Sequence, residues 1–112
     1  MEEFTIKFNK GRQWIQVYVY DVHPTTFANW GGGYWAYVYP VWYFPKDGKF
    51  MEFHAVKSGI REDTVAHEMV HVVWEWFVAN DLQFIRRNEE KFATKVDELV
   101  RKFHREYKKL EK

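Results

Sequence analysis

Two histidines and a glutamate stand in the otherwise mostly apolar stretch TVAHEMVHVVWEWFV, residues 64–78. A buried polar group without a partner costs roughly 1–3 kcal/mol, so a helix does not carry three such groups for packing alone. His67 and His71 are four residues apart, which on a helix places both rings on one face, with about 6 Å between Cα atoms. Both rings can then reach a single ion. Glu68 lies about 100° round the helix, beside this pair.

These residues form the pattern His-Glu-x-x-His, in which two neutral imidazoles hold Zn²⁺ and the glutamate takes a proton from the metal-bound water. Imidazole suits zinc as a ligand, and the base must be a carboxylate that lies near the water without binding the metal. The sequence therefore predicts His67 and His71 as zinc ligands and Glu68 as a general base. The competing interpretation is that both histidines are ordinary residues of a helix core or surface.

A third protein ligand is expected, because a catalytic zinc site usually has three of them and one open position. Glu75 continues the row of His67 and His71, but residues i and i+8 of a straight helix are about 12 Å apart, too far to share one ion. Glu89 and Glu90 stand at the expected start of a second helix. Either carboxylate could close the site if that helix packs antiparallel to the first, and the spacing leaves both open.

The first half of the chain is expected to form a sheet that helps to position these residues. Runs of strand character occupy the first half of the chain, at residues 3–8, 14–20, 37–44 and 49–56. Asp47-Gly48 predicts a hairpin turn between the last two strands. Pro40 cannot donate to a strand ladder, so the third strand is expected to lie at a sheet edge or to bulge at this residue. An extended peptide could dock on that edge as an additional strand.

After the fourth strand the apolar period changes from two to 3.6, which predicts a long helix. Ser58-Gly59 can cap this helix, and Glu62 and Asp63 fall in its first turn, where negative charge complements the helix dipole. The apolar pattern then continues to about Ala79. The His-Glu-x-x-His pattern thus lies inside a helix.

A second helix is expected from Asn88, a good N-cap, with apolar residues on one stripe and charges opposite. No internal repeat or linker divides the chain, so residues 1–112 are expected to form a single domain. The predicted fold class is α+β. It comprises a short N-terminal antiparallel or mixed sheet of about four strands packed on two long helices.

Composition limits the classes of partner. The net charge is +1 at pH 7, which argues against nucleic acid because phosphate contacts need a concentrated basic surface. A binder that stacks bases on its aromatics and uses the basic second helix is the least favoured alternative. The chain has no cysteine, so a disulfide scaffold and a thiolate metal site are excluded. The start, MEEFTIKF, is acidic and lacks a long apolar run, so we expect no signal peptide, no membrane span and a cytoplasmic location.

The chain resembles a known group of enzymes at two segments, HEMVH (67–71) and NEEKFA (88–93). Their pattern is similar to that of the gluzincins, the thermolysin-like zinc peptidases, and the length is similar to that of the single-domain minigluzincins. More narrowly, the two segments look like those of small metallopeptidases encoded by tailed phages, whose second segment reads Asn-Asp/Glu-Glu-x-x-Ala. The resemblance covers about residues 58–100.

Carried over to this chain, the resemblance implies a zincin-like fold in which Zn²⁺ is held by the two histidines and Glu90. It also implies that Glu68 is the general base and that Ala93, one turn after Glu90, leaves space free. The helical periodicity instead places Glu89 nearer the middle of the apolar stripe. Glu89 is therefore kept in reserve as the third ligand.

The function that the resemblance implies is zinc-dependent hydrolysis of a peptide bond. A domain this small has little room for deep subsites, which favours a narrow protein substrate. Glu68 would take the proton of the water and deliver it to the leaving amine. A group that stabilises the oxyanion is also expected, and the candidates are Tyr39, Tyr43, His54 and His23. His104 is a poor choice, because about 21 Å of helix separates it from Glu90.

A second function fits the same residues. In this alternative the protein is a non-catalytic module, and zinc or no metal stabilises an aromatic protein-binding surface. Exposed aromatics among Trp30, Tyr34 and Trp35 would favour it. They belong to NWGGGYW, residues 29–35, which is expected to be a mobile connection rather than a lid.

Overall fold

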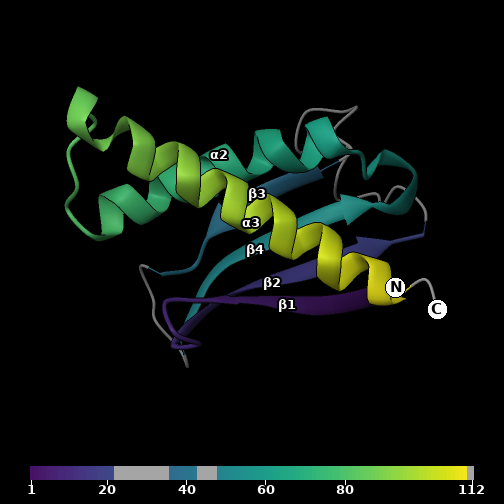
Figure 1. Ribbon diagram of the computed structural model, residues 1–112. Coiled ribbons are helices and arrows are strands. Elements are labelled where there is room, and N and C mark those ends of the chain that lie inside the picture. The colour runs from purple at the N-terminus through teal and green to yellow at the C-terminus, as the bar shows by residue number, and fades with distance from the viewer. Residues whose placement is uncertain (22–35, 43–47, 111–112) are drawn as a thin grey trace.

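The computed structural model describes residues 1–21, 36–42 and 48–110, which form a mixed sheet with two long helices across one face (Figure 1). The four strands are β1 (Glu2–Phe8), β2 (Gln13–Tyr20), β3 (Ala36–Pro40) and β4 (Lys49–Val56). They lie in the order β1-β2-β4-β3, in which β2 and β4 are parallel and each edge strand is antiparallel to its neighbour. The predicted α+β class, with a mixed sheet and two helices, is confirmed.

The helices follow the sheet in the chain. A short 3-10 turn, η1 (Lys57–Gly59), precedes α2 (Glu62–Ala79), and a second one, η2 (Arg86–Asn88), precedes α3 (Glu89–Leu110). In Figure 1, α2 and α3 run in opposite directions over the same side of the sheet, with α2 beside β3 and α3 reaching across to β1. The start of α3 therefore lies near the end of α2.

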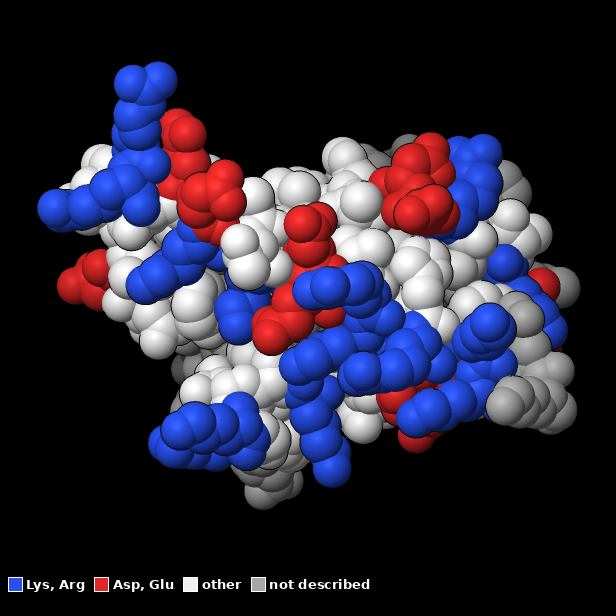
Figure 2. Space-filling view, in the orientation of Figure 1, with Lys and Arg blue, Asp and Glu red and all other residues white. Residues whose placement is uncertain are grey.

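The core lies between the sheet and the helices because the strands alternate. In β2, Ile15, Val17 and Val19 are buried, whereas Gln16 and Tyr18 point to the other face and are half-buried. The helix residues buried against this face are Val65, Met69, Val72, Val73, Phe77, Leu99 and Phe103. Only a narrow stripe of α3 is buried, and Figure 2 shows charged side chains of both signs over its outer surface.

The edge strand β3 is shorter than the predicted range 37–44. Its ladder ends at Pro40, which has no N–H to donate, although Val41 N–H still donates to the Phe50 carbonyl at 3.1 Å. β3 pairs only with β4 among the described strands, so the edge position that Pro40 predicted is confirmed. Several residues of the sequence-based hypotheses lie outside the described ranges: His23, residues 29–35, Tyr43 and Asp47.

The predicted cap of α2 needs correction, whereas the predicted start of α3 at Asn88 is confirmed. Ser58 and Gly59 belong to η1, and the N-cap of α2 is Arg61, which makes no side-chain capping hydrogen bond. The reason is that the chain becomes extended at residues 60 and 61 before it turns into α2. Asn88 does stand directly before α3, but its side-chain amide donates to the Gln83 carbonyl at 2.7 Å and closes the preceding turn.

Candidate functional site

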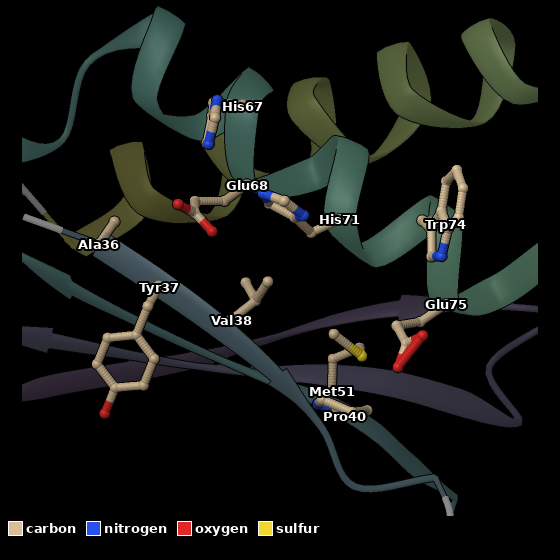
Figure 3. A pocket seen from close by; sticks show the side chains of 10 residues that line it. All are labelled: Ala36, Tyr37, Val38, Pro40, Met51, His67, Glu68, His71, Trp74 and Glu75. Carbon is tan, nitrogen blue, oxygen red and sulfur yellow. The ribbon is translucent and has the colours of Figure 1, made fainter. Parts of the chain in front are cut away.

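A pocket of about 570 Å³ lies between α2 and the edge strand β3 (Figure 3). It runs along α2 from His67 to Glu75 and along β3 from Ala36 to Pro40. In Figure 3, α2 and β3 both run from left to right, so Ala36 at the start of β3 lies below Glu68. The pocket thus contains all three residues of the His-Glu-x-x-His pattern.

The two histidines stand at the mouth of this pocket. His67 and His71 are exposed, one helical turn apart, and their ring centroids are 5.1 Å apart with 73° between the ring planes. Within the described ranges, neither ring makes a hydrogen bond or an ion pair. Two uncommitted imidazoles at this separation can offer two nitrogen donors to one ion.

Glu68 is the buried member of the group. It is 9% exposed, and burial raises the pKa of its carboxyl to about 7. Its carboxylate points from α2 into the pocket, toward Ala36 and Val38 (Figure 3). No hydrogen bond or ion pair to it occurs among the residues that the structure describes. A carboxyl whose pKa lies near neutral pH can both accept and donate a proton there, as a general base requires.

The wall opposite α2 is the outer edge of β3. Ala36, Val38 and Pro40 line the pocket, whereas the ring of Tyr37 points away from it (Figure 3). Tyr37 therefore lines the pocket through its backbone and Cβ. An edge strand has backbone N–H and C=O groups that no neighbouring strand uses. A pocket with a helix on one side and such an edge on the other can hold an extended chain.

The predicted third ligand lies elsewhere. Glu89 and Glu90 are exposed at the start of α3, and Glu89 lines a separate small hollow with Phe77 and Phe84 near the end of α2. Within the described ranges, no group of three or more His, Cys, Asp or Glu residues could hold a metal ion. The structure brings His67, Glu68 and His71 together, but it does not bring either glutamate of α3 to them.

Two of the proposed oxyanion-stabilising residues lie on the opposite face of the sheet. His54 is buried there, with its Nε2 3.0 Å from Glu52 Oε1 and its Nδ1 2.8 Å from the Tyr20 hydroxyl. The Tyr39 hydroxyl and the Lys49 ammonium also donate to Glu52. We call these five residues the Glu52 network. His54 and Tyr39 are therefore not at the pocket, which corrects their predicted role.

Ring stacking reinforces the Glu52 network. The His54 ring lies between Tyr18 and Tyr37, at centroid distances of 4.8 and 4.9 Å and interplanar angles of 20° and 6°. Burial lowers the pKa of His54, and the hydrogen bond that its Nε2 donates to Glu52 only partly offsets this effect. The imidazole is therefore neutral at pH 7, and it links three strands of the sheet.

Two polar and aromatic features of the structure, one at the pocket and one on the opposite face of the sheet, have signals in the sequence. The Glu52 network could have been found from strand periodicity, because Glu52 and His54 are two apart and must share a face. Trp74, which lines the pocket, could have been found from its position one turn after His71.

Within the described residues, no helix is long and apolar enough to cross a membrane. Comparison of the chain with models of known protein families, with curated proteins and with solved structures finds no match.

Proposed function

We propose that the protein is a zinc-dependent metallopeptidase of the gluzincin type, with His67 and His71 as zinc ligands and Glu68 as the general base. The observation that carries this proposal is the geometry of the pocket, in which the buried carboxyl of Glu68 lies between two exposed histidines whose ring centroids are 5.1 Å apart. A structural helix has no need of this combination, because a buried carboxyl without a partner is costly.

The donor set fits zinc in part. Two imidazoles one turn apart suit two positions of a tetrahedral ion. The third protein donor is not among the described residues at the pocket. Glu90, with Glu89 in reserve, stays a prediction for that position, and a zincin-like fold stays part of the proposal.

The chain's own residues then account for the proton transfers. Bound zinc lowers the pKa of a water molecule and polarises a peptide carbonyl. Glu68 faces the pocket, accepts the proton of the attacking water and returns it to the leaving amine. The outer edge of β3 holds the substrate backbone in an extended form beside α2. The substrate is a peptide or a protein.

Glu68→Gln tests the proposal most directly, because it keeps the shape of the side chain and removes the base. Hydrolysis of a susceptible peptide should fall at least about 10²-fold, the lower range for a positioned acid–base group. Zinc content should not change. Glu75→Gln is the matched control, because Glu75 lines the same pocket but lies beyond the reach of an ion held by both histidines. It should change the rate less than about fivefold.

The alternative is a non-catalytic module whose zinc site stabilises a protein-binding surface. A group of exposed apolar residues on α2 and after it favours this function. If wild type and Glu68→Gln behave alike across a broad peptide library while zinc is bound, the peptidase proposal is wrong and the binding module is favoured.

A further inference from the structure

Exposed apolar residues gather on one side of the molecule. Among the described residues, every exposed large hydrophobic except Met1 lies on α2 or in the segment after it. They are Val70 (42% exposed), Trp74 (52%), Val78 (43%), Phe84 (48%) and Ile85 (39%). We call these five residues the apolar strip. An exposed group of this kind marks a place where another molecule binds.

The middle of the strip is a rigid pair of aromatic rings. Trp74 stacks on Phe84 with 4.0 Å between ring centroids and 20° between planes. Phe84 in turn stacks on the buried Phe77 at 5.3 Å. The pair is therefore fixed before anything binds to it, so a ligand does not have to order it.

The apolar strip is continuous with the candidate site. Trp74 lines the pocket together with His67, Glu68 and His71. It follows His71 by three residues, which is about 5 Å along the helix axis. Val70 and Val78 lie four residues before and after Trp74, so they share its face of α2. The Trp74–Phe84 pair therefore extends from the wall of the pocket, at Trp74, to a residue outside it, Phe84.

Charge around the strip argues against an anionic surface as the occupant. Arg86 and Arg87 follow Ile85 directly, but Asp81 and Glu89 flank the same segment and offset them. Binding to an anionic lipid surface needs a net basic patch beside the apolar residues. Because the apolar strip is continuous with the pocket, it instead favours binding of a polypeptide whose neighbouring residues occupy the pocket.

We propose that Trp74 and Phe84 form a subsite for a large apolar side chain of the polypeptide substrate. This inference rests on the proposed function, because it places the scissile bond beside Glu68. An extended chain advances about 3.3 Å per residue. Trp74 lies six residues after Glu68, which is about 9 Å along the axis of α2. A side chain two or three residues from the scissile bond therefore reaches Trp74 when the substrate lies along β3, toward its Pro40 end.

Cleavage of a random peptide library tests the subsite. The wild type should select Phe, Trp or Leu over Ser at one fixed position, two or three residues from the cleaved bond and on one side of it. In Trp74→Ser this preference in kcat/KM should fall at least about tenfold, mainly through KM. Phe84→Ser should act in the same direction. Tyr107→Ser is the control: it removes a half-buried aromatic side chain of α3 that belongs neither to the pocket nor to the apolar strip, and it should change the preference less than twofold.

A binding measurement separates failure of the subsite from failure of the peptidase proposal. Fluorescently labelled peptides with Phe or Ser at the selected position are titrated into Glu68→Gln and into Glu68→Gln/Trp74→Ser. If no position is selected by cleavage, titration uses a Phe-scanned set of the same peptide. Tighter binding of a Phe peptide that depends on Trp74 supports the subsite even if the wild type cleaves nothing.

Cleavage without any Trp74-dependent preference overturns the subsite and leaves the peptidase proposal intact. Two other outcomes overturn it as well. One is Trp74-dependent sedimentation with phosphatidylserine vesicles in the absence of peptide binding. The other is Trp74-dependent self-association that blocks the Phe peptide. Because Trp74 is half exposed, Trp74→Ser should fold, and its thermal unfolding shows whether it does.

Discussion

The protein carries two groupings of histidine and glutamate, one on each side of its sheet, and they differ in what surrounds them. In the Glu52 network, both carboxylate oxygens of Glu52 accept hydrogen bonds and both ring nitrogens of His54 have partners. In the pocket, His67, Glu68 and His71 have no hydrogen-bond partner within the described ranges. The first grouping is complete without a ligand, whereas no residue that the structure describes uses the donors and acceptors of the second.

The two glutamates show the consequence for charge. Burial raises the pKa of Glu52 as well, but hydrogen bonds from Lys49, Tyr39 and His54 outweigh this effect and lower it to about 2. Burial acts alone on Glu68 and raises its pKa to about 7. A partly buried carboxylate with three donors stays charged at neutral pH, whereas a buried one without donors can exchange its proton there. The same residue type therefore stabilises the fold in one place and can move protons in the other.

The largest expected effect is on zinc content. After reconstitution and dialysis, the wild type should hold one Zn²⁺ per chain, and His67→Ala and His71→Ala should hold almost none, because each removes one of two adjacent donors. His54→Ala is the control, since it removes a histidine whose nitrogens are already engaged. Elemental analysis measures all four proteins. A wild-type stoichiometry near zero would eliminate the metal site, and zinc loss in His54→Ala would erase the contrast between the two groupings.

The next effect is on stability, and it should differ between the two glutamates. Glu52→Gln places an amide NH₂ against the Lys49 ammonium and breaks a charged hydrogen bond, so the free energy of unfolding should fall by about 1–3 kcal/mol. Glu68→Gln in the metal-free protein should leave stability unchanged or raise it, because it removes a buried acid that has no partner among the described residues. Urea unfolding at pH 7 measures both. If Glu52→Gln and Glu68→Gln lowered the free energy of unfolding equally, the two glutamates would not differ in the way proposed.

The stability that Glu52 contributes should also depend on pH in one direction. Its folded-state pKa of about 2 lies below the usual 4.5, so its contribution is fully present above about pH 4.5 and is lost as the pH falls toward 2. The difference in stability between wild type and Glu52→Gln should therefore shrink over that range. A difference that stays constant between pH 5 and pH 3 would show that the carboxylate is not held in its charged form.

Local periodicity was enough to predict the elements and the first three site residues. The change of apolar period after β4 placed His67, Glu68 and His71 on one helix, and their spacing alone set the geometry of the histidine pair. Pro40 correctly marked an edge strand, because the missing N–H is a local property. These features depend on residues that are close in sequence.

The remaining errors concern relations between elements. Strand alternation fixes that Glu52 and His54 share a face, but it does not say whether that face meets α2, so His54 was assigned to the wrong side. The number of residues between two positions also does not say which turns of two packed helices lie side by side. In an antiparallel pair with a short connection, the start of α3 lies beside the end of α2, whereas His67 lies in the first half of α2 and His71 at its middle.

The smallest expected effect on zinc concerns the glutamates at the start of α3. If Glu90 is the third ligand, as the gluzincin-type proposal predicts, Glu90→Ala should lower the zinc affinity about 10- to 100-fold and Glu89→Ala less than about threefold. Competition with a chelator of known affinity measures both changes. Because both glutamates lie outside the pocket, an unchanged affinity in both variants would remove Glu90 from the metal site. A loss confined to Glu90→Ala would establish Glu90 as the third ligand. It would also mean that the start of α3 moves along α2 toward His71 when zinc binds, because the two do not meet in the arrangement described.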